Sequence, residues 1–405
     1  MEPTRREFIV GAAGATASAL FASKTGAQSA NERLGVALIG CGGRGNDVLG
    51  ECLKRRKTRN LEFPAVCDVW KVNLESTAAR IEEATGRMPR TFTRYADLLA
   101  LPEVDCVIIA TPDFAHSPIL TAAAEAKKHA YVEKPMASRM EDANAALDTV
   151  LKNGIVCQVG TQRRSDGMHV AAARLIQSGV LGKMIRCDCG WHDNGPRWER
   201  DFSDVRQEDV DWEQYLMYLP MREFDPRMFR LWHLYKECSV GLVGLLGSHL
   251  IDIATWYNDD PLPRYAVGMG ENIVWTEREN TDTQECLFYY PKGFLLQYSS
   301  RLGNSKRGPE NVFYGTRGIF DTESWVARGN GGGADKIEEP IKVEPIRAMG
   351  HVDNWIRCIH AGNPRTHADI HTGYAHSVAS IMGSLACDTG HRMGFDPEAR
   401  IVKGG

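Results

Sequence analysis

Short apolar runs alternate with longer, helix-like stretches over the first 160 residues of the chain. Residues 34–39, 105–110 and 155–160 are mostly apolar, which is typical of parallel strands that are buried on both faces. Helix-like stretches such as 73–84 and 141–153 lie between them. Strands that alternate with helices predict an α/β domain with a parallel, doubly wound sheet, whose ligand binds at the carboxyl ends of the strands.

A glycine-rich loop follows the first apolar run. The sequence Gly-Cys-Gly-Gly-Arg-Gly begins at Gly40 and contains Gly42, Gly43, Arg44 and Gly45, which satisfies the pattern G-x-G-x-x-G. Glycines at these positions allow a tight turn, a close approach of backbone N–H groups to a pyrophosphate, and close packing of the next helix on the strand. The N-terminus of that helix also favours the negative charge of the phosphates. The loop therefore predicts a dinucleotide site.

A carboxylate after the second strand refines this prediction. The run over 63–67 ends at Asp68, 23 residues after the last glycine of the loop. This is close to the offset of about 20 residues expected for the acid that binds the adenosine ribose. Because a carboxylate disfavours a 2′-phosphate, we expect NAD rather than NADP. The nearby cations Arg44 and Lys71 leave NADP as the alternative.

Further motifs follow the later strands of the same predicted sheet. Their candidate cofactor-binding residues are Thr111, Pro112 and His116 after the third strand, Glu133 and Lys134 after the next, and Gln162 and Arg163 after the last. Because the carboxyl ends of parallel strands meet at one edge of a sheet, we expect these residues to surround the glycine-rich loop.

Together, the glycine-rich loop, the T-P-x-x-x-H sequence and the E-K-P sequence resemble those of the Gfo/Idh/MocA family, the family of glucose–fructose oxidoreductase and inositol dehydrogenase. The resemblance implies that Lys134 lies near the nicotinamide and the reacting sugar hydroxyl, and that Glu133 lies near the cofactor. It also implies that His116 approaches the cofactor or the substrate. From the residues alone, Lys134 is equally compatible with a solvated cation in a turn, and His116 with a helix-start residue.

A second motif of the family is matched only in part. The Gly-rich sequence from Gly241 leads to His249, at the position of the family histidine that transfers a proton with the lysine or binds the substrate. The family pattern D-x-x-x-H has an aspartate four residues earlier, where this chain has Leu245. Because residues i and i+4 share a helix face, we expect His249 to lack its usual carboxylate neighbour. The catalytic acid or base is then His249, Lys134 or a residue of 232–236.

The resemblance also implies two domains. We expect an NAD-binding Rossmann domain over 33–160, followed by an α+β domain over 161–405 with an open, mostly antiparallel sheet. The second domain would bind the substrate and form a homo-oligomer through its sheet. Strand-like runs such as 285–290 and 294–299 agree with this, and Pro-Lys-Gly between them favours a hairpin. The chain then ends in a helix and a short polar tail.

The N-terminus has the features of a targeting signal. Arg5 and Arg6 precede an apolar run over 10–21, and small residues follow over 26–29. This order is typical of a signal peptide, and the run is shorter than the about 20 residues that a membrane span needs. The paired arginines resemble the twin-arginine export signal. We therefore expect removal of residues 1–29, no stable membrane span afterwards, and a periplasmic or extracellular protein; the alternative is a frayed helix with a chance arginine pair.

Composition narrows the classes of partner. The chain has 405 residues, with 48 basic against 52 acidic residues and a formal net charge of −4. This balance argues against a nucleic-acid binder, which usually has a net basic footprint. The 11 cysteines include no C-x-x-C pair, and no cysteine or paired-histidine spacing suggests a structural zinc site. We therefore expect no metal site and interpret the cysteines as small buried hydrophobes.

These observations lead to a hypothesis of function. We expect an exported oxidoreductase that transfers a hydride between tightly bound NAD and a carbohydrate, with Lys134 and His249 handling the hydroxyl proton. Because no pool of free NAD is expected outside the cytoplasm, the cofactor must return to its starting redox state in each turnover. One alternative is a glycoside hydrolase that oxidises its substrate transiently, as some relatives do. The other is a catalytically silent sugar-binding protein, which the loss of the aspartate at Leu245 favours.

Overall fold

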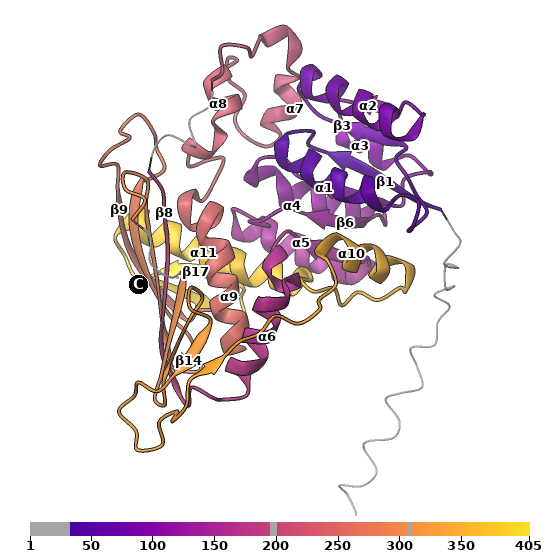
Figure 1. Ribbon diagram of the computed structural model, residues 1–405. Coiled ribbons are helices and arrows are strands. Elements are labelled where there is room, and N and C mark those ends of the chain that lie inside the picture. The colour runs from indigo at the N-terminus through magenta and orange to yellow at the C-terminus, as the bar shows by residue number, and fades with distance from the viewer. Residues whose placement is uncertain (1–32, 195–200, 307–309) are drawn as a thin grey trace, which may run out of the picture.

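A computed structural model describes residues 33–194, 201–306 and 310–405. The expected signal peptide at 1–29 lies outside the described residues. Within those residues, no helix is long and apolar enough to cross a membrane. Two sheets organise the molecule (Figure 1), and the predicted fold class, an α/β Rossmann domain with a second, mostly antiparallel sheet, is confirmed.

The first sheet is parallel and has helices on both faces. Its strand order is β4-β3-β1-β5-β6-β7, and β2 pairs with the start of β1. Side chains of β1 alternate between two buried clusters, because Val36 and Leu38 face one layer of helices and Ala37 and Ile39 face the other. The elements are β1 (Leu34–Ile39), α1 (Gly43–Arg55), β2 (Leu61–Glu62), β3 (Ala65–Cys67), α2 (Lys71–Thr85), β4 (Arg90–Phe92), α3 (Tyr95–Leu99), β5 (Cys106–Ile109), α4 (Asp113–Glu125), β6 (His129–Val132), α5 (Met140–Asn153) and β7 (Cys157–Val159).

Two prolines shape local details of this domain. Pro64 separates β2 from β3, because proline lacks the N–H that a strand ladder needs. Pro118 lies inside α4, which begins at Asp113. A proline at this position leaves the carbonyl of Phe114 without its helical donor. The hydroxyl of Tyr218, from the second domain, donates to that carbonyl at 3.2 Å.

The second sheet has the strand order β15-β14-β13-β12-β8-β11-β10-β9-β16-β17. Among the described strands, β8 and β11 form its parallel pair, and the remaining neighbours are antiparallel. The strands are β8 (Met184–His192), β9 (Tyr265–Glu271), β10 (Thr283–Tyr289), β11 (Leu295–Arg301), β12 (Asn311–Gly315), β13 (Ile319–Asp321), β14 (Val326–Arg328), β15 (Ile341–Lys342), β16 (Met393–Asp396) and β17 (Ile401–Gly404). The expected polar tail is therefore wrong, because β16 and β17 form a hairpin at the sheet edge.

The helices of the second part cover one face of this sheet and reach into the first domain. Trp355 and Ile356 of α10 belong to the same buried cluster as Val36 of β1, so that α10 completes the core of the first domain. The helical elements are η1 (Gln162–Ser165), α6 (Gly167–Gln177), η2 (Gln207–Asp209), α7 (Trp212–Leu216), α8 (Pro226–Arg230), η3 (Trp232–Leu234), the π-helix η4 (Val243–Gly247), α9 (Ser248–Asn258), α10 (His351–His360) and α11 (Ile370–Thr389).

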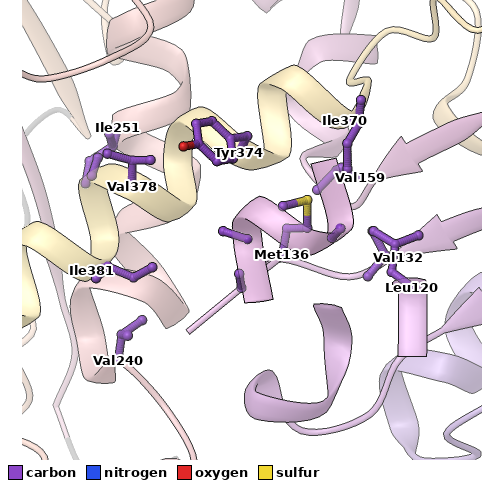
Figure 2. Close-up of a cluster of buried hydrophobic side chains, with 14 of the residues drawn as sticks. Leu120, Val132, Met136, Val159, Val240, Ile251, Ile370, Tyr374, Val378 and Ile381 are labelled. Carbon is purple, nitrogen blue, oxygen red and sulfur yellow. The ribbon is translucent and has the colours of Figure 1, made fainter. Parts of the chain in front are cut away.

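Helix α11 packs against both domains. Figure 2 shows Met136 and Val159 of the first domain beside Tyr374 of this helix, within one buried cluster. A side chain at Gly373 would place its Cβ 2.6 Å from the Met136 sulfur, so a glycine is needed for this close packing. His376 accepts a hydrogen bond of 3.2 Å from the backbone N–H of Met136. The segment that follows Lys134 is thereby fixed from the second domain.

Candidate functional site

The glycine-rich loop has both tight and open positions. A Cβ at Gly45 would lie 1.9 Å from the Gly40 carbonyl oxygen, and Gly40 itself has a φ of +94°. These two glycines are required by the fold. Gly42 and Gly43, by contrast, have no heavy atom within 4 Å of an added Cβ. The backbone at the start of α1 is therefore open to a ligand, as a pyrophosphate site requires.

Asp68 lies at the end of β3, beside the same loop. Its carboxylate accepts hydrogen bonds from the backbone N–H groups of Cys41 at 2.6 Å and of Trp70 at 2.8 Å. Burial raises the pKa of Asp68 to about 6, against the lowering effect of these hydrogen bonds. The carboxylate thus holds the loop in place and lies at the position expected for ribose recognition, a role that stays a prediction.

Arg44 and Glu133 meet across the carboxyl edge of the sheet. Arg44 Nε lies 2.7 Å from Glu133 Oε1. The Tyr131 hydroxyl accepts a hydrogen bond from Arg44 and donates one to Glu133 Oε1, both at 3.4 Å. Gly160 makes room for the carboxylate, because a Cβ there would lie 2.6 Å from it. The guanidinium is paired in this way, which makes it a weaker candidate for holding the 2′-phosphate of NADP.

A cleft of about 420 Å³ connects these features at the carboxyl ends of β1, β3 and β5. It is lined by seven of the residues expected to bind the cofactor, namely Gly40, Gly42, Gly43, Arg44, Asp68, Thr111 and Pro112. The hydroxyl oxygen of Thr111 is buried and has no hydrogen-bond partner among the described residues. An open glycine backbone, an orphaned hydroxyl and a carboxylate fit a dinucleotide, whose phosphates and ribose would be held there.

His116 does not line this cleft. Its ring is 2% exposed, and its two nitrogens lie 2.8 Å from the carbonyl oxygens of Thr111 and Pro135. Burial lowers the pKa of His116, and the two carbonyl contacts oppose that lowering. His116 therefore bridges the loop after β5 and the segment after β6, and helps to hold both in place.

Lys134 is held by a backbone carbonyl at the position where the family motif has its aspartate. Its ammonium donates to the Leu245 carbonyl oxygen at 2.6 Å. Leu245 lies inside the π-helix η4, one turn before His249. π-Helical turns are frequent at functional sites. The wider turn here presents a carbonyl to the lysine, whereas the leucine side chain is buried among its neighbours.

His249 lies at the start of α9 in a cationic environment. Burial lowers its pKa well below 6.5, and the charges of Lys134 and Arg163 lower it further. The Nδ1 atom is buried without a hydrogen-bond partner among the described residues. The imidazole is therefore neutral at pH 7 and offers a hydrogen-bond acceptor, but the lowered pKa makes it a weak base. Its ring centroid lies 6.4 Å from that of Trp191, which places an aromatic face beside it.

Gln162 and Arg163 lie at the junction of the domains, outside the cleft. Arg163 pairs with Glu310 at 2.6 Å, and its guanidinium lies 5.8 Å from the centre of the Trp191 ring. Gln162 is exposed and lines a separate outer groove together with Arg44. Contact of these two residues with a cofactor stays a prediction. Among the described residues, no group of three or more His, Cys, Asp or Glu is arranged to hold a metal ion.

Asp113 is a candidate site residue that the sequence analysis missed. Its side chain is 2% exposed and accepts a hydrogen bond from Ser239 at 2.7 Å. Burial raises its pKa to about 7, whereas Lys134 lowers it. An acid within the T-P-x-x-x-H motif was the available signal. Its burial depends on the loop around Ser239, which is distant in sequence.

Comparison with known families agrees with this geometry. Residues 34–161 match the oxidoreductase family with an NAD-binding Rossmann fold, and residues 169–321 match the GFO/IDH/MocA C-terminal domain. The chain belongs to the Gfo/Idh/MocA family. The family of the first match, together with the loop geometry, establishes an NAD-binding Rossmann domain.

Individual members of the Gfo/Idh/MocA family align over part of the chain. A scyllo-inositol 2-dehydrogenase (NAD(+)) of Bacillus subtilis (strain 168) is 40% identical over 89 residues, which is 22% of this chain and 26% of the relative. A glycosyl hydrolase family 109 protein of Shewanella sp. (strain W3-18-1) is 23% identical over 233 residues, 52% of this chain and 50% of the relative. The chain thus spans about half or less of the length of these curated relatives.

Solved structures of similar fold cover more of the chain. The WlbA dehydrogenase from Bordetella pertussis, in complex with NADH and UDP-GlcNAcA, has a TM-score of 0.67 and 19% identity over 90% of this chain and 99% of that one. The aldose-aldose oxidoreductase from Caulobacter crescentus, complexed with glycerol, has a TM-score of 0.67 and 18% identity over 90% and 100%. These likenesses support the two-domain fold.

Proposed function

We propose that this chain is an exported oxidoreductase that transfers a hydride between NAD and a sugar or glycoside, and that it retains its cofactor between turnovers. The observation that carries the proposal is the pairing of Lys134 with the Leu245 carbonyl, one helical turn before a neutral His249. The proximity of a cation to a proton acceptor supports the proposal; that both face the nicotinamide is part of the proposal itself.

The two side chains have distinct roles in the proposed reaction. When bound, the nicotinamide supplies a hydride acceptor and donor at C4. His249 accepts the proton of the sugar hydroxyl while the hydride leaves the carbon that carries this hydroxyl. The imidazole can take this role because it is neutral near pH 7. The Lys134 ammonium stabilises the negative charge that develops on the oxygen. In the reverse step, protonated His249 returns the proton as the hydride returns to carbon.

Retention of the cofactor follows from the expected export. A protein outside the cytoplasm that released NADH would stop after one turnover, so the hydride must be returned to a second sugar or to a product of the first. Micromolar affinity corresponds to only about 8 kcal/mol and would let NAD escape at low concentration. We therefore propose tight NAD binding, with NAD favoured over NADP by the Asp68 carboxylate.

A glycoside hydrolase is the second candidate, and the similarity to glycosyl hydrolase family 109 proteins supports it. Transient oxidation of a hydroxyl acidifies the neighbouring C–H, elimination expels the aglycone, water adds to the resulting double bond, and the hydride is returned. The sum of these steps is hydrolysis with no net redox change. The same pair, Lys134 and His249, would serve the oxidation and the final reduction.

A multiple-turnover assay tests the proposal. The protein is gel-filtered, the nucleotide released by denaturation is identified, and a panel of sugars and glycosides is converted with no NAD added. We expect bound NAD and many products per active site, whose chemistry distinguishes sugar oxidation and reduction from hydrolysis. If product formation stops near one molecule per active site and resumes only when NAD is added, the retained-cofactor proposal is wrong. The protein would then be a dehydrogenase that depends on free NAD.

A further inference from the structure

A segment of the second domain covers the cofactor cleft. Residues 205–232, here called the cover segment, contain α7 and α8 and lie over the carboxyl ends of the strands of the first domain (Figure 1). Six of their side chains line the same cleft as the glycine-rich loop, namely Gln214, Tyr215, Met217, Phe229, Arg230 and Trp232. The cleft is thus built from both domains.

Two contacts fix the cover segment to the first domain. Val210 forms an antiparallel bridge with Trp70, in which the backbone N–H of Asp211 donates to the Val69 carbonyl at 2.8 Å. At the other side of the cleft, Tyr218 donates to the Phe114 carbonyl at 3.2 Å. This is the carbonyl that Pro118 leaves without a helical donor. The segment therefore spans the cleft from the end of β3 to the start of α4.

Two polar atoms on the walls of the cleft have no hydrogen-bond partner in the part of the chain that the structure describes. Arg230 lies with its guanidinium carbon 4.8 Å from the centre of the Trp70 ring. The Nε atom of each side chain — Nε of Arg230 and Nε1 of Trp70 — is buried without a hydrogen-bond partner among the described residues. Leaving a buried donor unsatisfied costs about 1–3 kcal/mol, and more for a charged group. A ligand in the cleft would supply the missing acceptors.

The position of this pair indicates which part of the ligand it meets. Trp70 follows Asp68 by two residues, and Thr93 and Tyr95 at the end of β4 line the same part of the cleft. In the strand order, β3 and β4 lie on one side of β1, and β5 and β6, which lead to Thr111 and Lys134, lie on the other. The adenosine half of a dinucleotide therefore lies toward Trp70, and the nicotinamide half toward Lys134.

We propose that Arg230 and Trp70 bind the adenosine half of NAD, so that the cofactor is held by a residue of the second domain as well as by the Rossmann loop. This inference rests on the proposed function for the identity of the ligand and explains how NAD is retained. The adenosine leaves only when the cover segment parts from Val69 and Phe114, which makes dissociation slow.

The rate of NADH dissociation tests this assignment without measuring turnover. The full-length protein is loaded with NADH, excess NAD is added, and the loss of energy transfer from tryptophan to NADH is followed. We expect Arg230→Met to raise the dissociation rate roughly tenfold, the size of a desolvated cation–aromatic contact of about 1.4 kcal/mol. Tyr218→Phe, which removes one contact of the cover segment outside the cleft, should raise it as well.

Arg206→Met is the matched control, because Arg206 belongs to the same segment but is 68% exposed and pairs with Asp209. Circular dichroism and melting confirm that each variant is folded. Equal dissociation rates for the wild type and Arg230→Met overturn the assignment, whatever the turnover. A raised rate in a protein that converts no sugar or glycoside supports the assignment and overturns the proposed function instead. A wild type that binds no NADH overturns both.

Discussion

At the scale of residues, the arrangement of Lys134 depends on the group that takes the place of the aspartate in the family motif. Leu245 stands where the family motif has an aspartate, and the carbonyl of the same residue takes the Lys134 ammonium at 2.6 Å. A carbonyl dipole orients the ammonium but does not neutralise it, so the charge of Lys134 still acts on His249 and helps to keep the imidazole neutral. The catalytically silent alternative rests on the missing aspartate, and the multiple-turnover assay tests it.

Replacing Lys134 by alanine should affect chemistry far more than folding. The ammonium donates to the Leu245 carbonyl at 2.6 Å, and its proposed stabilisation acts on charge that is present in the transition state. We expect Lys134→Ala to lose about 100-fold or more in kcat, to retain NAD, and to melt near the wild type. Lys128→Ala is the control, since Lys128 also donates to a carbonyl, that of Leu101, at 3.0 Å. An unchanged kcat in Lys134→Ala would assign the proton chemistry to another group.

Asp113 should make the stability of the protein depend on pH. Its folded pKa, about 7, lies above the ordinary 3.8, so the folded chain holds this proton more tightly than the unfolded chain. The contribution of Asp113 to stability is therefore greatest below pH 4 and is lost as the pH rises to about 7. Asp113→Asn keeps an acceptor for Ser239 and should be more stable than the wild type at pH 8, by up to about 4 kcal/mol.

Chemical denaturation of both proteins at pH 8 and pH 5, with saturating NAD, measures this difference. The advantage of Asp113→Asn should shrink toward pH 5, where the wild-type carboxyl is also neutral. An equal difference at both values of pH would mean that Asp113 does not titrate in this range.

At the scale of elements, the start of α1 combines a requirement of the fold with one of the ligand. Gly45 must be a glycine because the helix packs directly on the Gly40 carbonyl, whereas the open space beside Gly43 leaves room for a ligand. The same contrast applies to α4. Pro118 weakens the first turns of this helix, and a hydroxyl from the cover segment compensates for the lost hydrogen bond.

Alanine substitutions separate the two requirements at α1. Gly45→Ala should destabilise the protein by more than about 2 kcal/mol even without cofactor, because its Cβ would meet the Gly40 oxygen at 1.9 Å. Gly43→Ala should leave the melting temperature of the cofactor-free protein almost unchanged while weakening NAD binding. The melting temperature of each variant, measured with and without NAD, tests both expectations. Unchanged NAD affinity in Gly43→Ala would place the pyrophosphate elsewhere.

At the scale of the whole molecule, the described residues leave one face of the second sheet uncovered (Figure 1). Several apolar side chains of neighbouring strands are exposed there, including Val267 (41%), Met269 (74%), Leu287 (37%) and Leu295 (41%). Val267 and Leu287 are direct partners in the ladder between β9 and β10. Contiguous exposed apolar surface marks interaction sites, and we propose that this face forms the homo-oligomer.

A charge on this face should separate the subunits. We expect Val267→Asp to lower the molar mass measured by light scattering after size exclusion, because burying an unpaired carboxylate in an apolar interface is unfavourable. Met88→Asp is the control, as Met88 is 51% exposed and lies in the first domain. A wild type that is already monomeric at micromolar concentration would contradict the proposal.

The parts of this protein that the sequence determined by itself are those governed by neighbouring residues. The apolar runs, the spacing of Gly40, Gly42 and Gly45, and the position of Asp68 predict the Rossmann strands and loop, because burial period and backbone sterics act within a few residues. The family resemblance located Lys134 and His249 as candidates, but it did not indicate what each would contact.

The tertiary structure decided how the candidates are joined. The contact between Lys134 and the Leu245 carbonyl links residues 111 apart in sequence, and that between Tyr218 and Phe114 links residues 104 apart. Such contacts depend on the whole path of the chain and on a π-helical turn, neither of which leaves a local pattern. The same holds for the packing of α10 into the first core and for the cover over the cleft. Hydrophobic packing between distant elements selects these arrangements, and local propensity does not encode them.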